Sequence, residues 1–192
     1  MRIDDSQFLN ARKRMIEFFD NEISHYVLPD IERLTNEIGP NHKDPGGCTI
    51  PLALTLFSLI DLFAFLITTD QKADKRKTER NYQYFLADSG YFPKHYTDNW
   101  ERILKLFRHG LTHQYFPKAS GIKRAGSCKP LVYKQNSIPV LNVDVLSKDV
   151  VDSINLIRAD IIENKDRNLI LRMNSRLDSL AKDDYQQRAE LN

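Results

Sequence analysis

Apolar residues recur at the spacing of an α-helix over most of this chain. The pattern between Ser6 and Ile38 predicts a long helix that is kinked or divided near Pro29, because proline fits only the first turn of a helix without strain. A similar pattern from Ser147 to Leu180 predicts a last long helical region, with Ser147 as its N-terminal cap. The sequence therefore predicts a mainly helical protein.

The segment from Ile50 to Thr69 is apolar on nearly every side of its predicted helix. It is about as long as a helix that crosses a bilayer, so a membrane span and a buried core helix are both open interpretations. A carboxylate in the middle of a membrane costs several kcal/mol, and Asp61 lies in the middle of this segment. We therefore interpret it as a core helix or a subunit interface, expect no membrane partner, and expect Asp61 to need a partner inside the protein.

A short β-hairpin is predicted between the helices. Leu131–Tyr133 and Ile138–Val143 have the composition of strands, and the polar residues 135–137 between them suit a turn. Ser120-Gly121 and Gly126-Ser127 are typical of loops. The predicted fold class is thus mostly α, a helical bundle of about five to six helices with a small β-hairpin inserted before the last long helix.

The length and composition of the chain fit one intracellular domain. With 192 residues, of which 41% are hydrophobic and 28% charged, it can bury a core of its own. We expect a single domain over 1–192, with its core at about 6–182 and a flexible tail at about 183–192. Cys48 and Cys128 are far apart and form no Cys-x-x-Cys pair, as is typical of reduced thiols. The first residues do not resemble a secretory signal, so we expect a cytoplasmic location.

The charges are unevenly distributed, although the net charge is only +2. Between Arg102 and Lys134 there are eight lysines and arginines and no aspartate or glutamate. Clustered cations attract polyanions, which makes RNA the expected partner. An alternative is that acidic residues from Asp144 onward pack beside this segment and neutralise it. Besides Arg108, the basic residues predicted to contact RNA are Arg102, Lys105, Lys118, Lys123 and Arg124.

Two histidines lie within this basic segment, at the end of a predicted helix. His109 and His113 are four residues apart, so they share one face of the helix, away from its apolar stripe. Imidazole titrates near neutral pH and is suited to moving protons there. RNA cleavage without a metal needs a base for the 2′-hydroxyl, an acid for the leaving oxygen and a cation for the charge on the phosphate. His113, His109 and Arg108 fit these roles.

The same stretch allows other interpretations. Two histidines four apart on a helix can share a zinc ion, but no carboxylate or thiolate lies near them in the sequence, and the surrounding cations repel a divalent metal. We therefore expect neither a metal nor a cofactor. Tyr115 and Phe116 follow directly, and we expect them in the core, as is usual for aromatic residues. Tyr115 is also a candidate for stacking on unpaired RNA bases.

The pattern of Arg108, four intervening residues and His113 resembles the motif of the HEPN superfamily, in which four to six residues separate an arginine from a histidine. Arg102 and His109, with six intervening residues, also satisfy that spacing. The context is similar to the family as well: a polar residue follows Arg108, the motif ends an amphipathic helix with a predicted capping box at 98–101, and a further long helix comes after it. His109 departs from the Asn or Asp that members more often carry, which leaves the role of this position open.

The resemblance implies a metal-independent endoribonuclease that acts as a homodimer, with the two motifs facing each other across a cleft. Arg108 would stabilise the phosphate oxygens, His113 would act as general acid or base, and His109 would assist. Such proteins serve as toxins, in phage defence or in RNA processing, and a cognate antitoxin or other partner protein accompanies some of them.

Two further hypotheses remain open. The first is a non-catalytic module, similar to family members without nuclease activity, that binds RNA or a protein through the same basic segment. The second is a structural protein that associates through the apolar helix at 50–67.

Overall fold

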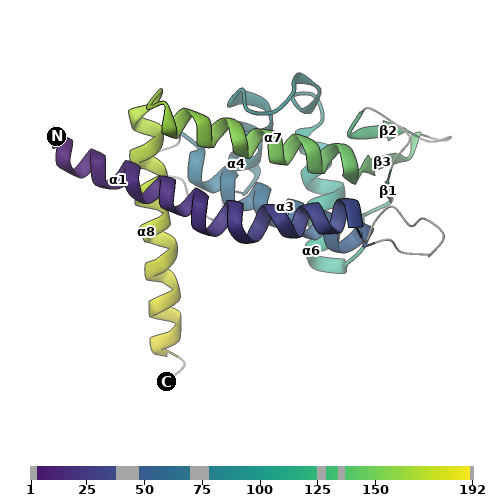
Figure 1. The fold of residues 1–192 in the computed structure, drawn as a ribbon. Coiled ribbons are helices and arrows are strands. Elements are labelled where there is room, and N and C mark those ends of the chain that lie inside the picture. The colour runs from purple at the N-terminus through teal and green to yellow at the C-terminus, as the bar shows by residue number, and fades with distance from the viewer. Residues whose placement is uncertain (1–3, 38–47, 70–77, 125–128, 134–136, 191–192) are drawn as a thin grey trace.

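The computed structural model describes residues 4–37, 48–69, 78–124, 129–133 and 137–190, with 183–190 as backbone only. Cys128, Gly126-Ser127, the turn residues 135–136 and the last two residues of the predicted tail lie outside these ranges. The predicted fold class is confirmed: the protein is mostly helical (77%), and a small three-stranded sheet precedes the last two long helices (Figure 1).

The first helical run is continuous from Asp5 to Glu37. It comprises α1 (Asp5–Glu17), η1 (Phe18–Val27), α2 (Leu28–Glu32) and η2 (Arg33–Glu37), of which η1 and η2 are π-helical. The side chain of Asp4 caps the run by accepting a hydrogen bond from the backbone N–H of Ser6. Pro29 lies in the first turn of α2, directly after the wider turns of η1. The proline therefore marks a change of helical pitch, and the chain stays helical through it.

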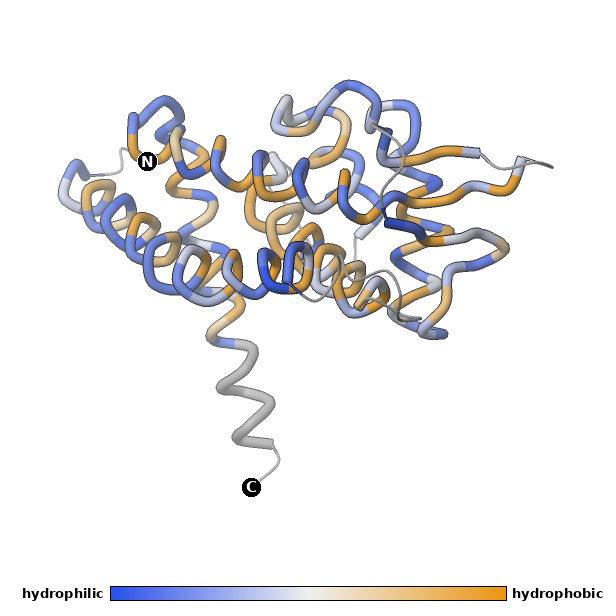
Figure 2. Tube along the Cα trace, turned by 45° about the vertical axis from the view of Figure 1, so that its right-hand side comes forward, coloured by the Kyte–Doolittle hydropathy of each residue, from blue (hydrophilic) through white to orange (hydrophobic). Residues whose placement is uncertain are grey.

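Helix α3 (Thr49–Ile67) forms the centre of the bundle. Eleven of its 19 residues are buried, and α4, α7 and α8 all pack against it. The outer helices turn hydrophilic positions outward and hydrophobic positions inward around it (Figure 2). Among the described residues, α3 is also the one helix that is long and apolar enough to cross a membrane. Its burial within a single chain agrees with the interpretation as a core helix.

A series of short helices leads from the core helix to the motif. They are α4 (Thr78–Gln83), η3 (Tyr84–Asp88), η4 (Lys94–Tyr96), α5 (Trp100–Arg102), η5 (Ile103–Arg108) and α6 (His109–Gln114). The predicted capping box at 98–101 is wrong: α5 begins at Trp100, and no side chain caps it. Glu101 instead forms an ion pair with Lys105, one turn further along the same helical stretch. The two residues are close because they are four apart on a helix.

The small sheet contains the predicted hairpin and one additional strand. Strands β2 (Leu131–Tyr133) and β3 (Pro139–Asn142) pair antiparallel, which confirms the hairpin. Strand β1 (Gly121–Lys123) pairs parallel with β3 on its other side, where the sequence predicted only a loop. A strand of three residues that starts with glycine carries no alternating pattern, so its pairing depends on β3 being in place.

The last helical region consists of two helices, α7 (Val143–Ile162) and α8 (Arg167–Glu190). Asn142 caps α7, its side chain accepting a hydrogen bond from the N–H of Asp144, so the prediction of Ser147 as the cap is wrong. Helix α8 crosses α1, α3 and α7 at a steep angle (Figure 1). Its arginines Arg172 and Arg176 donate to carbonyl oxygens in the last turn of α3, which have no partner within that helix. The backbone of 183–190 continues α8 in the range where a flexible tail was predicted.

The burial pattern of α7 predicts the cost of removing its side chains. Ile157 is fully buried, whereas the next residue along the chain, Leu156, is 51% exposed. We expect Ile157→Ala to lower the free energy of unfolding by about 2–5 kcal/mol, because it leaves a cavity in the core. The matched change Leu156→Ala should alter it by less than about 0.5 kcal/mol. Chemical denaturation of both variants tests the arrangement, and equal losses would contradict it.

Candidate functional site

The motif lies on one continuous helical stretch formed by α5, η5 and α6. Its apolar face packs into the core through Ile103, Leu104, Phe107 and Leu111. Because that face is buried, His109 is half-buried and His113 is exposed on the other side. Their rings stack with centroids 6.0 Å apart and an angle of 13° between the planes. The prediction that the two histidines share a face directed away from the core is confirmed.

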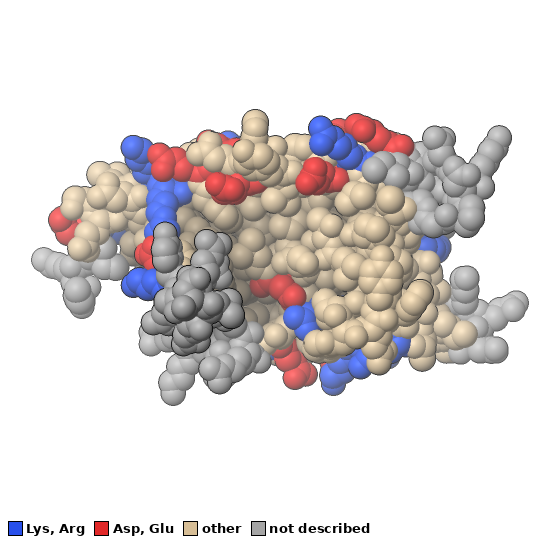
Figure 3. Space-filling view, turned by 90° about the horizontal axis from the view of Figure 1, so that it is seen from below, with Lys and Arg blue, Asp and Glu red and all other residues tan. Residues whose placement is uncertain are grey.

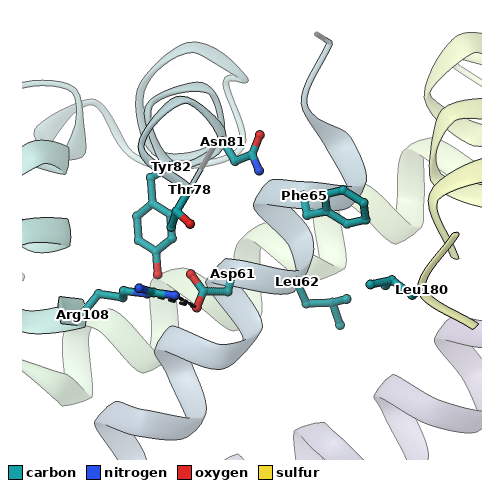
Figure 4. A pocket seen from close by; sticks show the side chains of 8 residues that line it. All are labelled: Asp61, Leu62, Phe65, Thr78, Asn81, Tyr82, Arg108 and Leu180. Carbon is teal, nitrogen blue, oxygen red and sulfur yellow. Dashed lines mark hydrogen bonds and ion pairs between the residues drawn. The ribbon is translucent and has the colours of Figure 1, made fainter. Parts of the chain in front are cut away.

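Arg108 is bound to the only charged residue of the core helix α3. Its Nε and Nη2 atoms donate to Oδ2 of Asp61 at 3.2 and 3.0 Å (Figure 4). The side chains of Arg108 and Asp61 are 18% and 30% exposed. Partial burial opposes the charge of the guanidinium, but the hydrogen bonds and charge of Asp61 outweigh it and raise the pKa of Arg108. Asp61 thus has the internal partner that its position in an apolar helix required.

Tyr82 from α4 covers the ion pair between Arg108 and Asp61. Its side chain is fully buried, and its hydroxyl points toward Arg108 and Asp61 (Figure 4) while it donates to the carbonyl of Phe57 at 3.4 Å. Burial, and then the negative charge of Asp61, raise the pKa of Tyr82 well above its usual value. Oδ1 of Asp61 is buried and has no hydrogen-bond partner among the described residues.

A cavity of about 270 Å³ opens beside this group. One wall is polar and the other is apolar, and α3, α4, η5 and α8 all contribute to it. Its lining residues are Asp61, Leu62, Phe65, Thr78, Asn81, Tyr82, Arg108 and Leu180 (Figure 4).

The side of the Arg108 guanidinium that faces away from Asp61 contacts His109. Nη1 of Arg108 lies 3.3 Å from Nδ1 of His109. A guanidinium is only a donor, so Nδ1 accepts this hydrogen bond and the proton of the neutral imidazole resides on Nε2. Partial burial lowers the pKa of His109, and the positive charges of Arg108, His113 and Lys118 lower it further. His109 is thus held as a neutral ring whose Nε2–H can donate.

The chain turns sharply after the motif and exposes two aromatic rings. Tyr115 has a φ of 61°, in the left-handed region, and its N–H donates to the carbonyl of Leu111 at 3.0 Å. Tyr115 and Phe116 are 54% and 65% exposed, and their rings meet edge to face at 6.0 Å. The prediction that they belong to the core is wrong, because the left-handed turn directs both side chains away from the bundle.

The basic residues around the motif have very different surroundings. Lys118 is exposed, and Lys123 is half-buried on β1. Lys105 is paired with Glu101, and Arg102 donates to the hydroxyl of Tyr133 at 2.7 Å. On the face seen in Figure 3, lysines and arginines occur singly or beside acidic side chains and do not form a continuous basic surface over the described residues.

Arg124 is occupied inside the protein. Its side chain is only 6% exposed, and its Nε and Nη2 atoms lie 2.9 Å from Oδ1 of Asp144. It also donates to the carbonyls of Leu34 and Thr35 in η2. For this arginine the alternative interpretation holds, in which acidic residues from Asp144 onward neutralise the basic segment. We therefore leave Arg124 out of the proposed RNA-binding surface.

A zinc site needs three or four ligands from side chains. Within the part of the chain that the structure describes, no group of three or more His, Cys, Asp or Glu side chains is placed to hold a metal ion.

Comparison with known proteins gave no match: no family model, no curated protein and no solved structure matches this chain. The resemblance to the HEPN superfamily therefore rests on the Arg108–His113 motif and on its place at the end of a helix in a helical bundle.

Gly110 lies where the chain after the motif folds back closely onto the motif helix. A Cβ atom at this position would lie 2.7–2.9 Å from backbone atoms of residues 116–118, which fold back over the helix. Gly→Ala in a helix normally stabilises by about 1 kcal/mol. Here we expect Gly110→Ala to destabilise the protein by about 1–3 kcal/mol, because the added methyl group overpacks the turn. Thermal unfolding measures the change in stability, and Gln114→Ala, a substitution at an exposed residue of the same helix, is the control. A Gly110→Ala protein more stable than the wild type would disprove the close approach.

The surroundings of His109 predict how its pKa responds to charge removal. Lys118→Ala should raise it, and Arg108→Gln should raise it further, because Arg108 is the nearer positive charge. Histidine resonances followed by NMR through a pH titration measure both changes. Lys13→Ala, which removes an exposed lysine of α1 paired with Glu17, should leave the pKa of His109 unchanged. No rise in the Arg108 variant would contradict the geometry.

Proposed function

We propose that this protein is a metal-independent endoribonuclease whose active site contains Arg108, His109 and His113. The observation that carries this proposal is the contiguity of the three side chains: Arg108 contacts His109 at 3.3 Å, and the rings of His109 and His113 stack at 6.0 Å. A cation beside two imidazoles, at a partly exposed position, is the equipment that cleavage of a phosphodiester by its own 2′-hydroxyl requires.

The reaction assigns a separate task to each side chain. The 2′-oxygen attacks phosphorus, a bond between O2′ and phosphorus forms, and the bond from phosphorus to O5′ breaks. His113 is exposed and takes the proton of the 2′-hydroxyl as general base. The second N–H of Arg108 Nη1, which the contact with His109 leaves available, and the Nε2–H of His109 donate to the phosphate oxygens, whose negative charge grows in the transition state. The products are a 2′,3′-cyclic phosphate and a 5′-hydroxyl.

The leaving O5′ also needs a proton. In the proposed homodimer, which follows from the resemblance, the His113 side chain of the second copy supplies this proton across the cleft. Lys118 and the exposed rings of Tyr115 and Phe116 lie next to the motif in the sequence and are suited to hold phosphate and to stack on unpaired bases. Arg102, Lys105 and Lys123 are proposed as a more peripheral part of the same surface. The proposed setting is cytoplasmic, in toxin activity, phage defence or RNA processing.

A non-catalytic RNA-binding module is the alternative function, and one observation favours it. The charge of Arg108 is compensated by Asp61 within the protein, which weakens the guanidinium as an electrophile. In this alternative the same surface holds RNA without cutting it. Binding would then be sensitive to salt, and the RNA would stay intact.

Cleavage of RNA in excess chelator tests the proposal. We expect the wild-type protein to shorten mixed cellular RNA and to leave cyclic phosphate and 5′-hydroxyl ends. His113→Ala should reduce the rate about 10²-fold or more, because it removes the general base, and should keep its affinity for RNA. His25→Ala, a change at an exposed histidine of η1 that packs on Tyr26, is the matched control and should cleave normally.

Two outcomes would contradict the catalytic assignment. If neither protein cleaves RNA although both bind it in a salt-sensitive manner, the binding module is the correct function. If His113→Ala loses binding and cleavage to the same degree, His113 serves to bind RNA and is not the general base.

A further inference from the structure

The ion pair between Asp61 and Arg108 is difficult to explain as a stabilising device. Asp61 is the one charged residue among the 19 of α3, and it lies on the partly exposed side of this helix, with Ser58 one turn before it and Leu62 next to it. A partly buried carboxylate loses hydration, and ion pairs in such places are often no more stable than apolar residues of similar volume. Both hydrogen bonds from Arg108 go to a single carboxylate oxygen of Asp61, Oδ2. The position of Asp61 therefore calls for a role in the site.

The geometry of the guanidinium indicates what that role is. Asp61 accepts from Nε and Nη2, which form one side of the guanidinium. The opposite corner, Nη1, is thereby directed at Nδ1 of His109. Arginine is planar and rigid at its end, so fixing two of its nitrogens also fixes the third. The buried ring of Tyr82 above the pair limits movement in the remaining direction (Figure 4).

We propose that Asp61 is the positioning residue of this site, which fixes the guanidinium of Arg108 and, through it, the orientation and tautomer of His109. This inference rests on the proposed ribonuclease function for its catalytic consequence, and on the contacts alone for its structural one. Asp61 acts through Arg108 and is not itself a catalytic residue. It also gives His109 a defined role, as a donor through Nε2–H, at the position where the HEPN motif more often has Asn or Asp.

Two substitutions at Asp61 distinguish its role in positioning Arg108 from the effect of its negative charge. Asp61→Asn keeps an oxygen that accepts from Arg108 but removes the negative charge. Asp61→Ala removes both, and Arg108 is then free to turn toward solvent. The charged groups that act on His109 are Arg108, His113 and Lys118, which lower its pKa, and Asp61, which raises it.

The two variants should therefore move the pKa of His109 in opposite directions. In Asp61→Asn, Arg108 stays beside His109 and the favourable negative charge is lost, so the pKa falls. In Asp61→Ala the guanidinium leaves, and because its effect on His109 exceeds that of Asp61, the pKa rises. NMR titration of the histidine resonances measures this without any RNA. Asp61→Leu fills the same space without an acceptor and should also raise the pKa, which keeps the test available if the alanine variant does not fold.

The cleavage assay should follow the same order. Asp61→Asn should stay within about tenfold of the wild-type kcat, because a neutral acceptor replaces a charged one. Asp61→Ala should lose about 10²-fold in kcat with little change in KM, because a misplaced guanidinium affects the transition state more than the binding of RNA.

A second ion pair in the molecule provides a matched control. Arg158 of α7 donates through Nε and Nη2 to the single oxygen Oδ1 of Asp20 at 3.2 and 2.7 Å, the same arrangement as in the site. Asp20→Asn and Asp20→Ala should change neither the pKa of His109 nor the rate of cleavage.

The outcomes distinguish this inference from the proposed function. A fall of the His109 pKa in Asp61→Ala and Asp61→Leu would show that Arg108 stays in place without Asp61, and would overturn the inference. Equal loss of cleavage in the asparagine and alanine variants would also overturn it, since the charge and not the position would then matter. Opposite pKa changes in a protein that does not cleave RNA would support the positioning role and refute the ribonuclease.

Discussion

Helix α3 is apolar on all but one narrow side, where Pro51 and Ser58 are exposed, so most of its surface has to be covered by other parts of the chain. Helices α4, α7 and α8 meet this need, and Arg172 and Arg176 of α8 satisfy carbonyls at its C-terminal end. The hydroxyls of Thr55 and Ser58 hydrogen-bond to carbonyls of the preceding turn within α3 itself. The carboxylate of Asp61 cannot donate to such carbonyls, so Asp61 needs a partner from another helix. Its partner comes from the helix that carries the motif, and this contact joins the motif to the centre of the bundle.

The proposed active site combines a rigid inner part with an exposed outer part. Phe107 and Leu111 are buried, and the turn at 116–118 closes tightly on Gly110, so the helix that carries the motif has little freedom. His113 and the aromatic rings that follow it face outward. This division suits a reaction on RNA, because precise placement of the phosphate-binding groups is needed on one side and access for a long polymer on the other.

The basic segment shows how a charge pattern in the sequence can mislead. Arg108 and Arg124 both turn inward, to Asp61 and Asp144, while Lys118 remains exposed. The acidic partners lie 47 and 20 residues away in the chain, outside the segment itself. A count of charges along a segment therefore overestimates the positive charge that RNA would meet, because folding can supply compensating charges from any other element.

The sequence by itself determined the features that depend on neighbours along the chain. These are the mostly helical fold, the burial of α3, the β2–β3 hairpin, and the shared face of His109 and His113, which follows from the period of the helix. Only the tertiary structure decided that Arg108 binds Asp61, that Tyr115 and Phe116 are exposed, and that β1 becomes a strand. Each of these depends on where distant segments meet or on a single left-handed residue, and periodicity holds no information about either. The sequence predicted that Asp61 needs a partner inside the protein, but only the packing of the helices determined that this partner is Arg108.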